Sequence, residues 1–139
     1  MSKKSGKIAA LIAGCQGKPR NAHYLGYFEC FNQGLFYEAH DVLEELWLGQ
    51  RDGPNYSYYK GLIQLAGAFV HLQKNRLRPS AALFKLARTN LAKYPTPYEG
   101  LDLGAMSTLI ESWLGALENS DFATNPLKPD NHPILRVEG

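Results

Sequence analysis

Two histidines and a glutamate are the side chains of this sequence whose types and spacing favour chemistry. His40 and Glu44 stand four residues apart in the stretch Tyr37–Trp47, which reads YEAHDVLEELW. In an α-helix that spacing places them one turn apart on the same face. His71 is the second histidine of interest, and Gln64 precedes it by seven residues. Seven residues are about two helical turns, so Gln64 and His71 also share a line on a helix.

These side chains predict a metal site or a pocket for a polar ligand. Imidazole and carboxylate groups are suitable ligands for a divalent transition metal, so His40, Glu44 and His71 are the candidate metal ligands. The same three residues are the candidate catalytic acids and bases. Gln64 and Trp47 are expected to line the pocket. A divalent transition metal is the cofactor that these residues indicate, and a small polar molecule is the alternative occupant.

Each of these signals also has a purely structural explanation. A histidine and a glutamate at positions i and i+4 commonly do no more than stabilise the flank of a helix. Gln64 and His71 could simply satisfy buried polar groups within a bundle. Known catalytic patterns are missing as well: the place where a zinc peptidase has its second histidine is Glu44, and no paired Glu-x-x-His segments are present.

Helical geometry separates His40 and Glu44 from the other acids of the stretch. An advance of 100° per residue puts His40 beside Trp47, at the rim between the expected core and solvent, with Glu44 next to it. The remaining three acids are predicted to point into solvent: Glu38, Asp41 and Glu45.

The elements that must position these residues are all helical. Helical periodicity dominates the chain, and no stretch has the sustained alternation of a strand. The sequence therefore predicts an all-α fold, a compact bundle of about five to six helices. The expected helices are a short one ending near Cys15, one over 21–32, one carrying His40 and ending before Gly49, one over 56–76, one from Pro79 to about 93, and one capped by Asp102.

The helix expected over 56–76 is apolar around most of its circumference, which predicts a central position. Its exception is a strip that holds Lys60, Gln64, Gly67 and His71. Glycine in a helix costs about 1 kcal/mol relative to alanine, so Gly67 suggests that a ligand or a neighbouring helix packs closely there. If this helix packs antiparallel to the preceding one, the strip could meet the rim of His40 and Glu44.

The length of 139 residues, with 45% of them hydrophobic, suits one domain over 1–139. Within it we expect a short helix and linker over 1–20, a helical core over 21–118 and an extended tail over 119–139. The tail contains three prolines and mostly polar residues. Its end is expected to be pinned to the body by Ile134, Leu135 and Val137.

Charge and cysteine content bear on partners and location. The formal charge is +2, from 15 basic and 13 acidic residues, and no basic run extends beyond Lys3, Lys4 and Lys7. This argues against nucleic acid as a partner, which needs a concentrated basic face. The two cysteines are too few for a disulfide scaffold and lack the spacing of a zinc site. We therefore expect a reduced, cytoplasmic setting.

The first fifteen residues allow a second interpretation of location. Basic residues precede an apolar run that ends at Cys15, as in a lipoprotein signal whose cysteine is acylated and anchored to a membrane. The apolar run is very short for such a signal. The alternative is an amphipathic helix, because Ile8, Leu11, Ile12 and Cys15 share one helical face.

The motifs around His40 and Gln64 also support a family resemblance. The segments FNQGLFYEAHDVLEELW and KGLIQLAGAFVHL resemble the small, mostly bacterial helical family catalogued as a domain of unknown function, number three hundred and nine. Position by position, the resemblance covers Phe31, Asn32, Gly34, Phe36, His40, Glu44, Trp47, Gly61, Gln64 and His71. It departs at Asp41, where the family usually has glutamate. The resemblance implies an all-helical domain with a shared pocket and supplies no reaction.

Two classes of function remain open from the sequence. The first is a metal-dependent or general acid and base enzyme, hydrolase-like, acting on a small polar substrate at His40, Glu44, Gln64 and His71. The second is a non-catalytic binding or assembly module, with a homodimer as the expected assembly. The second rests on aromatic side chains of the kind enriched at interfaces: Tyr24, Tyr27, Tyr56, Tyr58, Tyr59 and Trp113.

Overall fold

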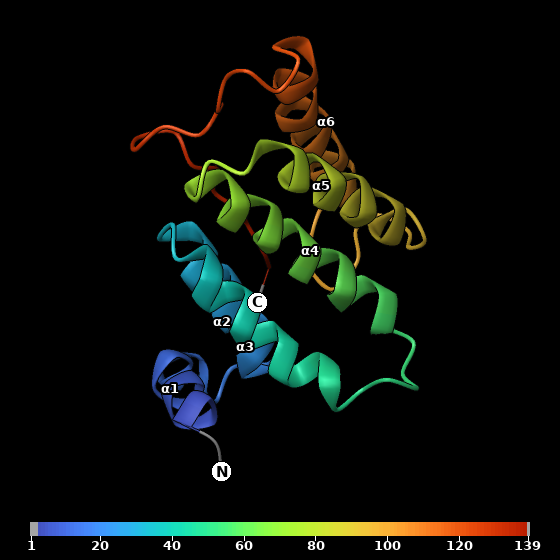
Figure 1. The fold of residues 1–139 in the computed structure, drawn as a ribbon. Helices are drawn as coiled ribbons and strands as arrows, with labels where there is room; N and C mark the ends of the chain where they lie inside the picture. Colours follow the sequence, from blue (N-terminus) through green and yellow to red (C-terminus); the bar gives the residue numbers. More distant parts are fainter. Residues whose placement is uncertain (1–2, 139) are drawn as a thin grey trace.

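A computed structural model of the chain describes residues 3–138, and it confirms the all-α fold (Figure 1). Met1, Ser2 and Gly139 lie outside the described residues, as do the side chains of Lys3 and Lys4 from the predicted basic cluster. The elements are α1 (Lys3–Leu11), the 3-10 turn η1 (Ala13–Cys15), α2 (Ala22–Asn32), α3 (Phe36–Leu48), α4 (Tyr56–Gln73), α5 (Leu77–Leu91) and α6 (Leu103–Asn119). Between Lys3 and Glu138 there is no β-strand, only two isolated β-bridges.

The N-terminal segment is the amphipathic helix that the spacing of its apolar residues predicts. Ile8, Ile12 and Cys15 are buried on the face that α1 and η1 turn inward, and Leu11 is half-buried beside them. The segment that a lipoprotein signal would remove thus contributes two large side chains to the core. None of the helices described here has the length and hydropathy needed to cross a membrane.

Helices α2, α3 and α4 pack side by side and form the first layer of the core. The Asn21 side chain caps α2 by accepting hydrogen bonds from the backbone N–H groups of His23 and Tyr24, at 2.8 and 3.4 Å. Gly34, with φ of +77°, then lets the chain turn into α3. Figure 1 shows α3 and α4 running antiparallel after the turn that joins them, as expected.

The central position predicted for α4 is confirmed. It packs on α3 along one side and on α5 along another. Phe69 lies fully buried in the middle, with its ring centroid 5.0 Å from that of Phe36 and 5.3 Å from that of Phe84. The helix ends at Gln73, three residues before the expected end, because Asn75 adopts a left-handed φ of 55° that stops the helix.

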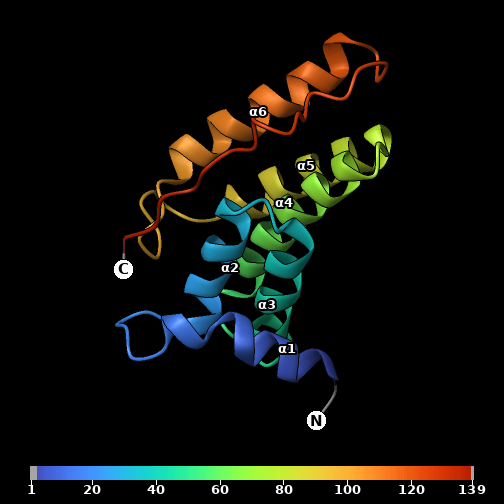
Figure 2. The same ribbon diagram turned by 90° about the vertical axis from the view of Figure 1, so that its left-hand side faces the viewer.

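Helices α5 and α6 add the second layer. α5 starts at Leu77, before Pro79, which therefore lies in the first helical turn, where a missing N–H costs no helical hydrogen bond. The Asp102 carboxylate caps α6 as predicted, accepting a hydrogen bond from the N–H of Ala105 at 3.0 Å. Figure 2 shows α6 and the tail on one side of the molecule and α1 on the opposite side.

The tail is extended and returns to α2, where Asn32 holds it. The Asn32 side chain donates to the carbonyl of Leu135 at 2.8 Å and accepts from its N–H at 2.7 Å. Leu135 is buried and Val137 is half-buried, as predicted. The expectation for Ile134 is wrong, because successive side chains of an extended chain point to opposite sides, and Ile134 is 56% exposed.

Four of the six aromatic side chains assigned to an interface are instead in the core. Tyr24, Tyr27, Tyr58 and Tyr59 are all buried, and only Tyr56 and Trp113 are half-buried. Tyrosine tolerates burial when its hydroxyl has a partner. The Tyr27 hydroxyl donates to the Leu62 carbonyl at 2.6 Å, and the hydroxyls of Tyr24 and Tyr58 are bonded to each other at 2.7 Å.

Candidate functional site

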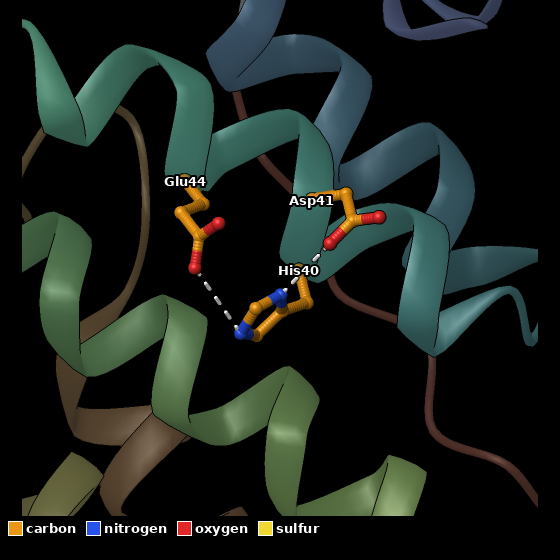
Figure 3. A group of neighbouring side chains, drawn as sticks. All are labelled: His40, Asp41 and Glu44. Carbon is orange, nitrogen blue, oxygen red and sulfur yellow. Dashed lines mark hydrogen bonds and ion pairs between the residues drawn. The ribbon is translucent and has the colours of Figure 1, made fainter. Parts of the chain in front are cut away.

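His40 lies on α3 between two carboxylates, and the three side chains form a compact cluster (Figure 3). The buried face of α3 fixes the rotation of the helix, because Ala39 and Leu43 are fully buried in the core. His40 then falls at the edge of that buried face, and His40, Asp41 and Glu44 are all half-buried. Figure 3 shows the His40 ring extending from α3 on the side where α4 lies.

Both ring nitrogens of His40 face an acid. His40 Nδ1 lies 3.2 Å from Asp41 Oδ1, and His40 Nε2 lies 3.7 Å from Glu44 Oε2 one turn along. The three side chains are 31%, 13% and 28% exposed, in the order His40, Asp41 and Glu44. The cluster is therefore open enough for an ion to enter and sheltered enough for its charges to interact.

One ligand atom from each of these three residues lies within 4.8 Å of the other two. Ligands at about 2.1 Å from one metal ion lie about 3 to 4 Å apart, so small side-chain rotations would bring this set onto an ion. Of the predicted metal ligands, His40 and Glu44 belong to the cluster. His71 does not belong to it, and Asp41 takes the third place.

The solvent-facing positions predicted for Glu38, Asp41 and Glu45 are wrong, because all three acids are half-buried. The helical count considered only one core side of α3, whereas α1 and α2 pack against further parts of its circumference. Glu45 pairs with His23 of α2 at 2.9 Å for this reason. The feature of the sequence that could have identified Asp41 as a member of the cluster is its position directly after His40.

Within the polar strip of α4, Gln64 and Gly67 face α5, which corrects the expectation that Gln64 turns toward His40. Gln64 Oε1 accepts a hydrogen bond from the side-chain amide of Asn90 at 2.8 Å. A Cβ atom on Gly67 would lie 3.1 Å from Leu83 Cδ1. The close neighbour predicted at Gly67 is thus a helix, and Gln64 joins α4 to α5.

His71 stands apart from the cluster but has an unusual environment. Its Nδ1 atom is buried and has no hydrogen-bond partner among the described residues. Burial lowers the pKa of His71 below its usual value of 6.5, and the positive charges of Arg76 and Lys74 lower it further. The imidazole is therefore neutral at pH 7, the form that binds metals. Among the described residues, His71 belongs to no group of three or more candidate metal ligands.

Trp47 packs at the corner between α3 and α4. Its ring centroid lies 5.2 Å from that of Tyr56 at the start of α4, and the ring is half-buried against the core. Trp47 Nε1 is buried with no hydrogen-bond partner among residues 3–138. The contacts of Trp47 are those of a packing residue, and its predicted role in lining a pocket stays a prediction.

Comparisons with known proteins agree with the resemblance seen in the motifs. The family model described as Domain of unknown function (DUF309) matches residues 24–83, from the core of α2 into α5. An uncharacterised protein of Aquifex aeolicus (strain VF5) is 32% identical over 88 residues, which is 63% of this chain. The chain spans about a quarter (26%) of that relative's length. No solved structure matches the chain. The matched segment contains all three residues of the His40 cluster, and over residues 24–83 the chain is similar to the DUF309 family.

Proposed function

We propose that the cluster of His40, Asp41 and Glu44 binds a divalent transition metal ion and uses it for hydrolytic chemistry on a small polar substrate. The observation that supports the proposal is the placing of one imidazole and two carboxylates within 4.8 Å of one another on a single helical turn. Imidazole and carboxylate together suit zinc, manganese, iron or nickel.

The two nitrogens of His40 suggest different roles for the two acids. An imidazole that binds an ion through one nitrogen usually donates the N–H of the other nitrogen to a carboxylate, which fixes the tautomer. The contact of 3.2 Å between His40 Nδ1 and Asp41 fits that donor role. Nε2 would then face the ion together with Glu44. In this assignment His40 and Glu44 are the metal ligands and Asp41 is a positioning residue.

Two protein ligands leave further coordination positions for water and substrate. A bound divalent ion supplies a polarised, more acidic water for hydrolysis. Glu44 and Asp41 would supply negative charge that holds the ion, and the partial exposure of all three side chains would let a small substrate reach it. Among the described residues, the three converging side chains are too few for a closed structural site of four protein ligands.

A metal-free form of the same chemistry has a separate observation in its favour. An aspartate that accepts a hydrogen bond from a histidine orients that histidine as a general base. The contact between His40 Nδ1 and Asp41 has this arrangement. A chelator separates the two forms, because it would abolish metal-dependent hydrolysis and leave a histidine base unaffected.

Thermal unfolding of tag-free protein with added Zn, Mn, Fe or Ni ions tests metal binding. At an ion concentration about 100 times the dissociation constant, binding stabilises a protein by about 2.7 kcal/mol. For a chain of this size that amounts to a rise in Tm of about 8 °C. The rise should vanish in His40→Ala and persist in His23→Ala, which removes the histidine of the separate pair with Glu45. No rise with any of the four ions would contradict the proposal.

The two cysteines bear on where the protein works. Cys15 and Cys30 are both free and buried. Free buried thiols suit a reducing compartment, and we propose the cytoplasm as the setting.

A further inference from the structure

We infer that the cavity between η1, α2 and the C-terminal tail binds a small amphipathic anion, a carboxylate with an apolar body. The cavity has a volume of about 690 Å³, within the range of small-molecule sites. Its lining residues do not overlap with the cluster around His40. The inference is therefore independent of the proposed metal site.

The apolar part of the cavity comes from three segments that are far apart in the sequence. Leu11 belongs to α1, Leu25 and Phe28 to α2, and Leu135 to the tail. Leu25, Phe28 and Leu135 are buried and belong to the hydrophobic core. Such a floor suits the aliphatic or aromatic body of a ligand.

The charged side chains that line the cavity have a net charge of +1. Lys18 and Arg136 line the cavity together with a single acid, Glu29. All three side chains are exposed at its edge. Neither Lys18 nor Arg136 makes an ion pair with another described side chain. Two cations without an ion-pair partner in the part of the chain that the structure describes, at the edge of an apolar floor, match the charge of a carboxylate headgroup.

The remaining polar side chains that line the cavity carry no charge. Burial raises the pKa of Cys15, and burial with the nearby charge of Glu38 raises the pKa of Cys30 to about 11, so both are thiols at pH 7. Asn32 is committed to its two hydrogen bonds with Leu135. These groups add no charge, so Lys18, Arg136 and Glu29 decide which headgroup the cavity prefers.

The C-terminal tail forms one wall of this cavity. The Asn32 clamp places Leu135 inside, and the alternation of extended backbone keeps Arg136 exposed. Figure 1 shows the end of the tail reaching the region of α2 from the far side of the fold. The wall that carries Arg136 therefore exists only when the tail is docked.

Titration calorimetry with decanoate tests the inference on the whole chain. Decanol and decylammonium serve as neutral and cationic controls of the same length, all below their micellar concentrations. We expect one decanoate per chain, bound about tenfold more tightly than decanol, and weaker binding still for decylammonium. Equal affinity for decanoate and decanol, or no binding of decanoate, would overturn the inference.

Variants locate the binding in this cavity. Lys18→Ala with Arg136→Ala should weaken decanoate binding about tenfold, whereas Arg51→Ala with Lys93→Ala removes two exposed cations outside the cavity and should leave it unchanged. All four positions are exposed, so both double variants should fold, which circular dichroism checks. Equal losses in the two double variants, or none in the first, would contradict the assignment.

Discussion

Asp41 Oδ1 lies 3.2 Å from His40 Nδ1, so the ring nitrogen that does not face Glu44 already has an acidic partner (Figure 3). Asp41 is also the least exposed of the three side chains, at 13%. The imidazole is thus held by a neighbour in the chain while its Nε2 atom is directed toward the acid one turn away. This arrangement separates the expected effects of the two carboxylates.

Asp41→Asn should weaken metal binding about tenfold without abolishing it, because removing the acid that supports a ligating histidine costs about 10- to 100-fold in affinity. Glu44→Gln should lose binding more completely, because it removes a ligand. Zinc titration of both variants measures this. Glu38→Gln is the matched control, an acid of the same helix outside the cluster. An affinity of Asp41→Asn equal to that of the parent would reject the positioning role.

Asn32→Ala should release the tail. The variant loses both hydrogen bonds to Leu135, each worth about 1 kcal/mol, so we expect the free energy of unfolding to fall by about 2 kcal/mol. Hydrogen exchange at the amides of Leu135 and Glu138 should become faster than in the parent. Asn32→Asp keeps the acceptor for the Leu135 N–H and should retain part of the protection. Unchanged exchange in Asn32→Ala would show that the clamp does not hold the tail.

Substitution by alanine should destabilise the protein at Gly61 and stabilise it at Gly115. A Cβ on Gly61 would lie 3.0 Å from Leu91 and 3.2 Å from Asn90 Cβ, so Gly61→Ala should push α5 away and cost about 1 kcal/mol. A Cβ on Gly115 in α6 would meet nothing within 4 Å, so Gly115→Ala should stabilise by about 0.5 to 1 kcal/mol through helix propensity. Urea unfolding of both variants measures the two changes. Stabilisation by Gly61→Ala would contradict the close packing of α4 on α5.

The lowered pKa of His71 predicts a pH dependence of stability. The folded state binds a proton at His71 less tightly than the unfolded state, whose value is near 6.5, because burial disfavours the charged ring. The unfolded state therefore holds more protons just below pH 6.5, and this contribution to stability falls as the pH falls through that window. His71→Gln should flatten the dependence between pH 7.5 and 5. An NMR titration midpoint of His71 at or above 6.5 would contradict the assignment.

The helices were predictable because their signals are local. Asn21 and Asp102 cap the helices that their positions predicted, and the apolar circumference of α4 indicated its central place. The short turn after α3 made its antiparallel packing on α4 predictable as well. Within the cluster, His40 and Glu44 came from the spacing of four residues, which is also a local property.

The sequence did not predict which neighbouring helix each polar side chain contacts, because those contacts depend on how the helices pack. Gln64 could have met α3 or α5, and its bond to Asn90, 26 positions further along the chain, decides for α5. Asp41 and Glu45 looked solvent-facing until α1 and α2 were placed beside α3. The hydrogen bonds between Asn32 and Leu135 join residues 103 positions apart, and no periodicity of the sequence predicts such a contact.

Binding of a metal ion by the cluster on α3 is measured by the metal content of tag-free protein after equilibrium dialysis against zinc. We expect about one ion per chain for the parent and for His23→Ala, and close to none for His40→Ala and Glu44→Ala. Equal metal content in the parent and His40→Ala would contradict it.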